Sequence, residues 1–505
     1  MNSKIIKLKD LKKKILELKK QKKKIVQCHG VFDVVHIGHI NHFKKAKDYG
    51  NIIIVTVTSD RFVNKGNNRP IFSQDKRIEF IAELDCVDYV SLSDCPDANN
   101  LIKIIKPNFY IKGQDYKESK NDKTGKINSE KKNVEKYGGK IIFTNEASFS
   151  SSNLINEFNF NNSQLKFLKK IRDKYSLDYI HKLFKKISQL KVLVIGETII
   201  DQYNFCEALG KSGKEPYLAL KDIYSEEYLG GAAAIANHIA DFTKKIKLIS
   251  MTGDNNQYEK FIKNKLNKKV QRVFFRKKNS PTILKKRYID NITKNKLFGI
   301  YSLNDDISPI KDDIKICKYI EKDIPKYDLI LISDYGHGFI SNKTAKKITS
   351  KKKYIALNAQ VNAANIGYHD LLKYKNIDAV IINETELRHE MRNKNDETKL
   401  LSAQLQRKLN TNDLLVTRGK HGAILLSKKN KKFIESPAFA KNVIDKVGAG
   451  DAMLSIISLL IKIGAPKDLS LLLGSFAGSI SVETIGNSVS INKQNFLRQI
   501  EFSLK

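Results

Sequence analysis

Two histidines flank a glycine near the start of the chain, in the stretch HIGH at residues 36–39. A strand-like run precedes this stretch and a helix-like run follows it, so His36 and His39 lie where a strand passes into a helix. The first amides of a helix lack intrahelical partners and lie at the positive end of its dipole, which favours a phosphate group. Gly38 lets the backbone approach that group closely. These residues predict stabilisation of the charge that develops on phosphorus during nucleotidyl transfer, and Lys47, two helical turns after His39, is predicted to assist.

A glycine-rich turn near the end of the chain forms a second motif. Gly448, Ala449 and Gly450 precede Asp451 and a long apolar, helix-like run. Consecutive amides of such a turn can point at one place and form an anion hole at the start of a helix. Asp451 is placed to accept the proton of a substrate hydroxyl that attacks the γ-phosphate of ATP. The alternative is a plain helix start with a stabilising acid in its first turn.

Alternating strand-like and helix-like segments must position these motifs. A strand at residues 24–30, the helix after His36 and a strand at 51–60 form a strand–helix–strand unit of the parallel α/β type. The alternation continues through a helix, a strand and a helix at residues 74–84, 89–92 and 99–105. A second α/β pattern begins at Lys191 and reaches the glycine-rich turn. The sequence therefore predicts two separate α/β domains.

The predicted organisation has four parts. They are a basic helical extension, a first α/β domain, a linker helix and a second α/β domain, at residues 1–24, 25–160, 161–189 and 190–505. The segment EPYLALKDIYSEEY, residues 215–228, is strand-like and fits a small β lid in the second domain. Closure of such a lid would exclude water from the γ-phosphate and limit its hydrolysis.

The composition favours an enzyme of the cell interior. A net charge of +37 comes from 79 lysines and 12 arginines spread over the whole chain, so we interpret it as a general bias that helps anionic substrates and predict no specific nucleic-acid partner. The five cysteines lack a CxxC or other zinc-like spacing. No apolar run approaches the roughly 18 residues that span a bilayer, and the basic N-terminus lacks an apolar signal region. A reduced, cytoplasmic protein without a membrane partner is expected.

By themselves the two histidines also fit an ordinary turn and helix start, but residues 24–157 resemble the cytidylyltransferase-like nucleotidyltransferase superfamily. The resemblance rests on the residues around HIGH, on KG at 65–66, on KGQDY at 112–116 and on the serines at 150–152. It implies a Rossmann-like parallel sheet and a set of residues that bind the nucleotide and its phosphates: Gly30, Phe32, Asp33, Gly38, Lys65, Arg77, Ser150 and Ser151. It also implies that Lys112 and Asp115 lie near the acceptor substrate. The arginine that precedes the serines in glycerol-phosphate cytidylyltransferases is absent, which favours the sugar-1-phosphate members.

Residues 190–495 resemble the ribokinase-like carbohydrate kinase family. Besides GAGD, the resemblance rests on SDYG at 333–336, the Asn-x-x-Glu box at 383–386 and TRG at 417–419. It implies an α/β domain with a small β lid, sugar contacts from one set of residues and nucleotide contacts from another: Asp201, Gly230, Gly231 and Asn237 for the sugar, and Thr417 and Gly419 with the GAG turn for the nucleotide. It further implies that Asn383 and Glu386 organise the magnesium shell through water.

As a pair, the two halves resemble the bifunctional heptose-7-phosphate kinase and heptose-1-phosphate adenylyltransferases, which make ADP-heptose for lipopolysaccharide and carry the kinase first. The order is reversed here. The resemblance implies ATP-dependent phosphorylation of D-glycero-D-manno-heptose 7-phosphate at O1, then adenylyl transfer to the sugar 1-phosphate with release of pyrophosphate. The implied cofactors are ATP and Mg²⁺. The implied partners are small sugar phosphates and a nucleoside triphosphate, with a homodimer left open.

Departures from the kinase pattern leave the sugar open. LNAQ at 357–360 replaces the Asp-Pro-Lys of the family, Lys446 and Val447 replace its usual threonines, and an expected Arg-x-Asp is missing. One alternative is a cytidylyltransferase fused to a kinase for a different sugar or polyol, and another is that just one half is active. A rival of another class is a basic nucleic-acid-binding protein on a degenerate enzyme scaffold, which predicts steeply salt-dependent binding.

Overall fold

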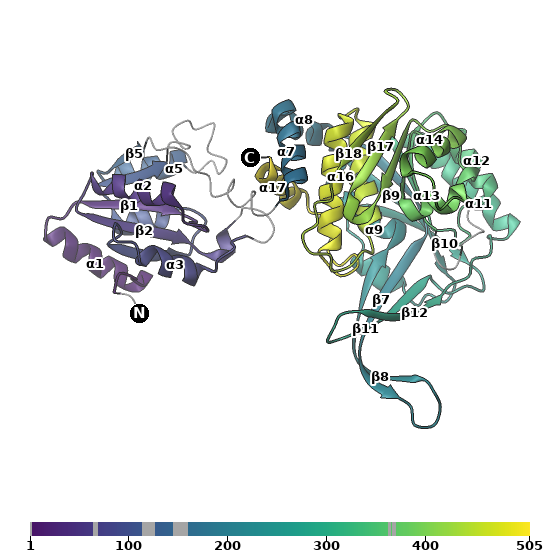
Figure 1. Cartoon of the computed structure of the whole chain (residues 1–505), viewed down its shortest axis with the longest axis horizontal. Coiled ribbons are helices and arrows are strands. Elements are labelled where there is room, and N and C mark those ends of the chain that lie inside the picture. The colour runs from purple at the N-terminus through teal and green to yellow at the C-terminus, as the bar shows by residue number, and fades with distance from the viewer. Residues whose placement is uncertain are drawn as a thin grey trace. The chain divides into compact units, whose positions relative to one another are not determined.

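The computed structural model describes residues 3–63, 69–113, 127–144, 160–361, 365 and 370–504. The chain forms two compact units (Figure 1). Apart from a few residues at the C-terminus, the first comprises Met1–Asn161 and the second Asn162–Ile500. Among the described residues, no helix has the length and apolar character to cross a membrane.

The first unit is built on a five-stranded parallel sheet in the order β3-β2-β1-β4-β5. Its strands are β1 (Ile25–Gly30), β2 (Ile52–Thr58), β3 (Tyr89–Ser93), β4 (Phe109–Gly113) and β5 (Lys140–Thr144). From β1 the chain proceeds to one edge of the sheet and then resumes at β4 on the other side of β1. Ligands of open α/β sheets bind at the carboxyl ends of the strands where the order reverses in this way. The end of β1, just before His36, is therefore the expected binding place.

Helices flank this sheet at α1 (Leu8–Lys20), α2 (Ile37–Lys47), α3 (Gln74–Ala82), α4 (Asn99–Ile105) and α5 (Ile127–Lys136), with a 3-10 turn η1 (Asp60–Phe62). The N-terminal basic segment belongs to the unit's core. Leu11, Ile15 and Leu18 of α1 are buried against Leu101 and Ile105 of α4. Their spacing places them on one face of α1, while the lysines of the helix are exposed except for the half-buried Lys14. What the sequence suggested as an extension is thus a packed helix of the first unit.

The second unit is built on a nine-stranded sheet in the order β10-β9-β6-β13-β14-β15-β16-β17-β18. Its strands are β6 (Lys191–Gly196), β9 (Lys245–Gly253), β10 (Val270–Lys277), β13 (Leu329–Asp334), β14 (Tyr354–Ala359), β15 (Ala379–Asn383), β16 (Asp413–Thr417), β17 (Ala423–Ser427) and β18 (Lys432–Ser436). Neighbours are parallel except where β17 joins β16 and β18. The carboxyl ends of the parallel strands therefore share one edge, which is where a second site is expected.

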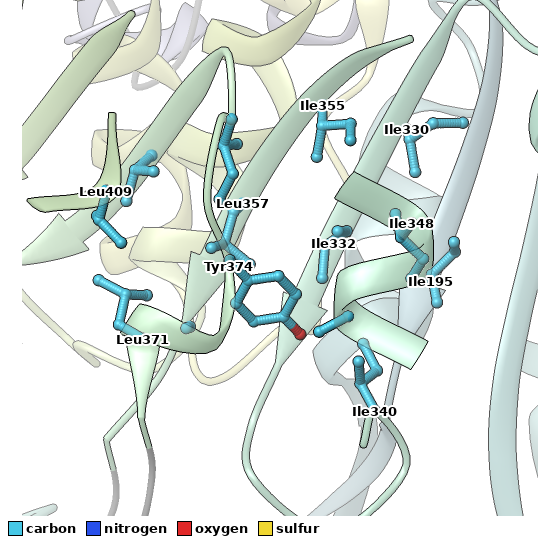
Figure 2. Close-up of a cluster of buried hydrophobic side chains, with 14 of the residues drawn as sticks. Ile195, Ile330, Ile332, Ile340, Ile348, Ile355, Leu357, Leu371, Tyr374 and Leu409 are labelled. Carbon is cyan, nitrogen blue, oxygen red and sulfur yellow. The ribbon is translucent and has the colours of Figure 1, made fainter. Parts of the chain in front are cut away.

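The core of the second unit consists mainly of isoleucine and leucine (Figure 2). Strand residues two apart point to the same face, so Ile330 and Ile332 of β13 contribute together with neighbours from β6 and β14. Tyr374 is a buried member of this cluster, and its hydroxyl donates a hydrogen bond to Asp334 at 2.7 Å. The near-continuous apolar runs of these strands are typical of parallel strands that are buried on both faces.

The remaining helical elements of the second unit are α7 (Asn162–Lys174), α8 (Leu177–Ile187), α9 (Gly231–Ile239), α10 (Glu259–Lys265), α11 (Ile310–Asp323), α12 (Asn342–Thr349), α13 (Glu384–Met391), α14 (Thr398–Leu409), α15 (Ala449–Lys462), α16 (Lys467–Val482) and α17 (Lys493–Ser503), with 3-10 turns η3 (Ile324–Lys326), η4 (Leu371–Lys373) and η5 (Gly419–His421). The predicted linker helix is two helices, α7 and α8. Ser176 separates them, because its side chain caps α8 by accepting the Tyr179 N–H. Phe184 of α8 packs against Phe242 and Phe496, so this segment is part of the second unit.

A four-stranded sheet in the order β12-β11-β7-β8 extends from the second unit and corresponds to the predicted lid (Figure 1). Its strands are β7 (Thr198–Lys211), β8 (Leu218–Gly230), β11 (Leu284–Asp290) and β12 (Lys296–Ser302). The long antiparallel pair β7 and β8 projects farthest. Both ends of this pair adjoin the large sheet, since β7 follows β6 and β8 leads directly into α9.

Candidate active sites

The two histidines of HIGH form the N-terminal cap of α2. The His36 Nδ1 accepts the Gly38 N–H at 3.1 Å, and the His39 Nδ1 accepts the His36 N–H at 3.3 Å. The ring centroids are 4.0 Å apart. A neutral imidazole that accepts at Nδ1 carries its hydrogen at Nε2, and burial lowers the pKa of His36, which favours that neutral form. The cap therefore fixes both rings with Nε2–H donors at the start of the helix.

Gly30 and Phe32 shape the loop that leads to these histidines. The Phe32 ring packs edge-on against His39, with centroids 5.4 Å apart, and against Phe43. A Cβ at Gly30 would lie 2.9 Å from that ring. Glycine at position 30 therefore allows Phe32 to hold His39 in place, so these two predicted nucleotide-binding residues support the site through packing.

Two other predicted nucleotide-binding residues have structural roles, which corrects the expectation for each. The buried Asp33 pairs with Arg69 at 2.5 Å and accepts the N–H groups of Ile71 and Phe72. Arg77 is also fully buried, and it donates to backbone carbonyls that include those of Phe72 and Thr58, at 3.0 and 2.8 Å. Since these charges are satisfied inside the protein, they tie the loop after β1 to the start of α3.

The structure describes two of the three lysines predicted for the first site, and both are paired with carboxylates. Lys47 lies at the far end of α2, roughly 16 Å along the helix from His36 by the usual rise per residue, and pairs with Asp88 at 2.6 Å. Its expected role beside the histidines is thus corrected. Lys112 lies at the carboxyl end of β4 and is buried 3.4 Å from Glu130. The predicted residues Lys65, Asp115, Ser150 and Ser151 lie outside the described residues.

A third histidine was missed by the sequence reasoning. His42 follows His39 by three residues and therefore lies on the same side of α2. Its Nδ1 is 3.0 Å from the Thr144 hydroxyl of β5, and burial lowers its pKa to about 4. The spacing HxxH after the glycine was the available signal. A neutral His42 therefore joins α2 to the end of β5.

The GAGD turn lies at the start of α15, as predicted for an anion hole. Gly448 has a φ of +86°, and a Cβ there would lie 2.2 Å from the Asn487 Oδ1. A Cβ at Gly450 would meet no atom within 4 Å, so the backbone of the first helical turn is open on that side. The first turn of this 14-residue helix has no side-chain cap and is accessible at Gly450, as an anion hole requires.

Asp451 lies in that first turn and accepts a hydrogen bond from the Tyr335 hydroxyl at 2.7 Å. Burial raises the pKa of Asp451 to about 7; the charge of Asp201 raises it further, while Tyr335 and Lys285 oppose the rise. A general base is most effective when its pKa lies near the working pH. In the sequence Tyr335 is part of the SDYG motif, and its contact with Asp451, 116 residues away, cannot be predicted from local pattern.

The structure groups three of the four predicted sugar-binding residues. Asp201 of β7 pairs with Arg287 of β11 at 2.5 Å, and a Cβ at Gly230 would lie 2.4 Å from the Asp201 Oδ2. Gly231, with a φ of +62°, is equally confined, because a Cβ would lie 2.4 Å from the Glu197 carbonyl. Gly230 therefore lets the end of β8 approach Asp201, and Gly231 lets the start of α9 approach Glu197.

Asn237 does not join this group, which corrects its predicted role. Its Nδ2 donates to the Lys265 carbonyl at 3.1 Å, and its Oδ1 accepts the Asn267 N–H at 2.8 Å. The side chain therefore holds the turn between α10 and β10. The sequence pattern did not show which way the Asn237 side chain points from α9.

Asn383 and Glu386 cap α13 reciprocally. The Glu386 carboxylate accepts the Asn383 N–H, and the Asn383 Oδ1 accepts the Glu386 N–H, both at 2.8 Å. Burial raises the pKa of Glu386 to about 8, and the charge of Asp451 contributes to the rise. A divalent cation near Glu386 and Asp451 would favour the charged forms of both carboxylates. These residues therefore fit a site for a divalent cation. Over the described ranges no cluster of three metal-ligating side chains occurs.

Thr417 and Gly419 follow β16 at the same edge of the large sheet. Gly419 has a φ of +54°, and a Cβ there would meet no atom within 4 Å. Thr417 ends the strand next to Asn383, with which it is in register between β16 and β15. The structure therefore places both predicted nucleotide-binding residues beside the Asn383–Glu386 box.

Comparison with known proteins agrees with this division. Residues 189–494 match the pfkB family carbohydrate kinase, and residues 28–158 match the cytidylyltransferase-like family. The bifunctional protein HldE of Pseudomonas savastanoi pv. phaseolicola (strain 1448A / Race 6) is 28% identical over 313 residues, which cover 60% of this chain and 62% of the relative. HldE of Geobacter metallireducens is 35% identical over 131 residues, a quarter of either chain. Such alignments span less than two thirds of the relatives' length.

Among solved structures, phosphofructokinase-2 from Escherichia coli in complex with potassium aligns along its whole length with 62% of this chain. The TM-score is 0.50 and the sequence identity is 13%. At this identity the likeness concerns the fold of the second unit alone.

Proposed function

We propose that this chain, which belongs to the pfkB family of carbohydrate kinases through residues 189–494, is a bifunctional enzyme of sugar-nucleotide biosynthesis. Its cytidylyltransferase-like domain covers residues 28–158. The second unit phosphorylates O1 of a sugar phosphate, D-glycero-D-manno-heptose 7-phosphate, with ATP. The product is the 1,7-bisphosphate, so a separate phosphatase must remove the 7-phosphate before the second step. The first unit then transfers an adenylyl group from ATP to the sugar 1-phosphate and releases pyrophosphate. The similarity to proteins named bifunctional protein HldE supports the pairing, and the ADP-sugar would serve lipopolysaccharide synthesis in the cytoplasm.

The observation that carries the kinase assignment is the position of Asp451. Its carboxylate lies at the start of α15, is held by Tyr335 and is close enough to Asp201 for their charges to interact. In the proposed step, Asp451 accepts the proton of the acceptor hydroxyl, whose oxygen bonds to the γ-phosphorus while the bond to the leaving ADP breaks. The amides of the GAG turn stabilise the transferring group.

Magnesium would be held near Glu386 and Asn383, through water, and would supply charge neutralisation for the nucleotide phosphates. Glu386 contributes a carboxylate whose neutral form is favoured without a nearby cation. Asn383 holds that carboxylate in place through the cap of α13. The departures at LNAQ and at Lys446 and Val447 do not involve these groups.

The capped histidines carry the nucleotidyltransferase assignment. An oxygen of the sugar 1-phosphate attacks the α-phosphorus of ATP, and pyrophosphate leaves. The Nε2–H groups of His36 and His39, together with the α2 dipole, would stabilise the added negative charge. His42 and Thr144 support the orientation of the helix.

Two single substitutions in the full-length chain test the division of labour. Asp451→Asn should abolish ATP-dependent phosphorylation of the sugar phosphate and leave pyrophosphate release from a supplied sugar 1-phosphate unchanged. His36→Ala should do the reverse. Loss of both reactions in either variant, with the fold retained, would contradict two independent sites.

The nucleotide is tested by offering ATP and CTP in parallel to the wild-type chain with sugar 1-phosphates and following pyrophosphate release. ATP should support turnover. If CTP alone does so, the adenylyltransferase assignment fails and the alternative, a cytidylyltransferase fused to a kinase for another sugar or polyol, takes its place. A panel of phosphorylated six- and seven-carbon sugars, assayed for ADP release, identifies the acceptor.

A homodimer through the lid sheet forms part of the proposal. Large apolar side chains are exposed on its strands: Leu209, Leu218, Ile223, Tyr224, Leu297, Phe298, Ile300 and Tyr301. An exposed apolar surface of this kind marks an interaction site. Sedimentation of the wild type should show a dimer that a charged substitution at Phe298 dissociates, and a monomeric wild type would refute this part.

A further inference from the structure

Lys285 of β11 is a buried cation whose charge the kinase mechanism does not use. The residue is 6% exposed, and within the described part of the chain its ammonium group has neither a hydrogen-bond acceptor nor an ion-pair partner. Two aromatic rings flank it, Tyr301 at 5.6 Å and Tyr335 at 5.8 Å from Nζ to the centroid. Burial lowers its pKa. Withdrawing an ammonium group from water without a hydrogen-bonded partner costs free energy, so a ligand is the natural partner.

The position of Lys285 directs it toward the acceptor. Lys285 is in register with Asp201 on the parallel strand β7, and residues paired in this way point to the same face. The Tyr335 ring beside Lys285 carries the hydroxyl that contacts Asp451. The ammonium group is therefore close enough to interact with two carboxylates: Asp201, expected to hold the sugar, and Asp451, expected to remove its proton.

The charges around this face leave Lys285 unmatched. Arg287 is paired with Asp201, and Lys296 with Asp445, each at 2.5 Å. Lys277 donates to the backbone carbonyls of Asn304, Asp306 and His337, and Asp451 accepts a hydrogen bond from Tyr335. Two further carboxylates act on Lys285 at longer range: Asp305 contacts His337, and the buried Glu197 accepts backbone N–H groups. None of these carboxylates forms an ion pair with the Lys285 ammonium group in the described part of the chain.

We propose that Lys285 binds the phosphate that the acceptor sugar already carries, so that it selects a phosphorylated over a neutral sugar. The inference rests on the proposed kinase function. The amides at the start of α15 serve the transferring phosphoryl group, whereas Lys285 belongs to the lid strand beside Asp201. An anion here completes the hydrogen bonding of the ammonium group and offsets its charge.

The test compares Lys285→Met with Lys286→Met in the full-length chain. Lys286 is the matched control, because the next residue of a strand points to the opposite face. In ADP-release assays, Lys285→Met should raise KM for the phosphorylated sugar by about 10- to 100-fold, the loss of one charge-assisted hydrogen bond. It should leave KM for ATP within a few fold and leave KM for the unphosphorylated sugar unchanged. Because the charge of Lys285 lowers the pKa of Asp451, kcat should fall near pH 7 for both sugars and recover at alkaline pH. Lys285→Arg should restore part of the loss, and Lys286→Met should behave as wild type.

An equal fall in kcat for both sugars that persists at alkaline pH, with KM for the phosphorylated sugar unchanged, would assign Lys285 to the transferring phosphate and overturn the proposal, as would no change at all. Calorimetric titration with inorganic phosphate, in the absence of turnover, separates this proposal from the reaction itself. The wild type and Lys286→Met should each show one phosphate-binding site that Lys285→Met lacks. If this extra phosphate site is found but no sugar phosphate is turned over, the proposed kinase reaction is refuted and the phosphate-binding role of Lys285 is supported. If Lys285→Met binds phosphate as the wild type does, the subsite fails.

Discussion

Removal of the Tyr335 hydroxyl should change the pH dependence of the kinase. This hydroxyl donates to Asp451 at 2.7 Å and lowers the pKa of a carboxyl group that burial has raised to about 7. A hydrogen bond to a charged group contributes about 1.5–3 kcal/mol, and 1.36 kcal/mol corresponds to one pH unit. In Tyr335→Phe, the acid limb of the kcat/KM profile should therefore move by about one to two pH units toward alkaline pH.

The assay follows ADP release from pH 6 to 9.5. At pH 7 the charged fraction of Asp451 falls from near one half to a few per cent, so Tyr335→Phe should be roughly 5- to 50-fold slower there and recover most of its rate at the alkaline end. Tyr374→Phe is the matched control, because it removes an equivalent hydrogen bond, to Asp334 at 2.7 Å, without touching Asp451. A rate loss in Tyr335→Phe that is the same at every pH would show that Asp451 is not the base, and the reasoning would be refuted.

Three further predictions concern stability and the anion hole. Gly448→Ala should abolish kinase activity, because its Cβ would meet Asn487 at 2.2 Å and φ is positive; Gly450→Ala, where space is open, should retain the fold, as thermal melting can show. Asp33→Ala should destabilise the first unit in urea by about 3–5 kcal/mol, since it leaves Arg69 buried and unpaired, and a second change, Arg69→Met, should recover part of this. Burial raises the pKa of Glu386 to about 8, so the folded state keeps a proton that the unfolded chain releases. The free energy of unfolding should fall as pH rises from about 4 to 8, and in Glu386→Gln this fall should be smaller.

Much of the architecture could be predicted from local pattern. The two-domain α/β class and the two family resemblances were confirmed. The helix expected at residues 99–105 has those bounds, and the strand expected at 89–92 is Tyr89–Ser93. Apolar periodicity and turn residues act over a few positions, so a single sequence carries them. The glycine turn before Asp451 and the histidines at the start of α2 are likewise local features.

The polar partners could not be predicted in this way. Asp33 and Arg77 match a nucleotide-binding pattern as residue types, yet each meets buried groups of its own unit. Lys47 shares a helix with the histidines but reaches Asp88 at the far end. Which charges meet depends on the order of the strands and on register, and both are set by contacts between distant segments.

The sequence by itself determined where the chain makes its glycine turns and helix starts, and hence where phosphate groups can be held. Only the tertiary structure decided what surrounds them: the contact of Tyr335 with Asp451, the pairing of Asp201 with Arg287, and the unmatched charge of Lys285. The physical reason is range. A backbone turn is fixed by neighbouring residues, whereas the charge and protonation of a buried group depend on whatever the fold brings within a few ångströms of it.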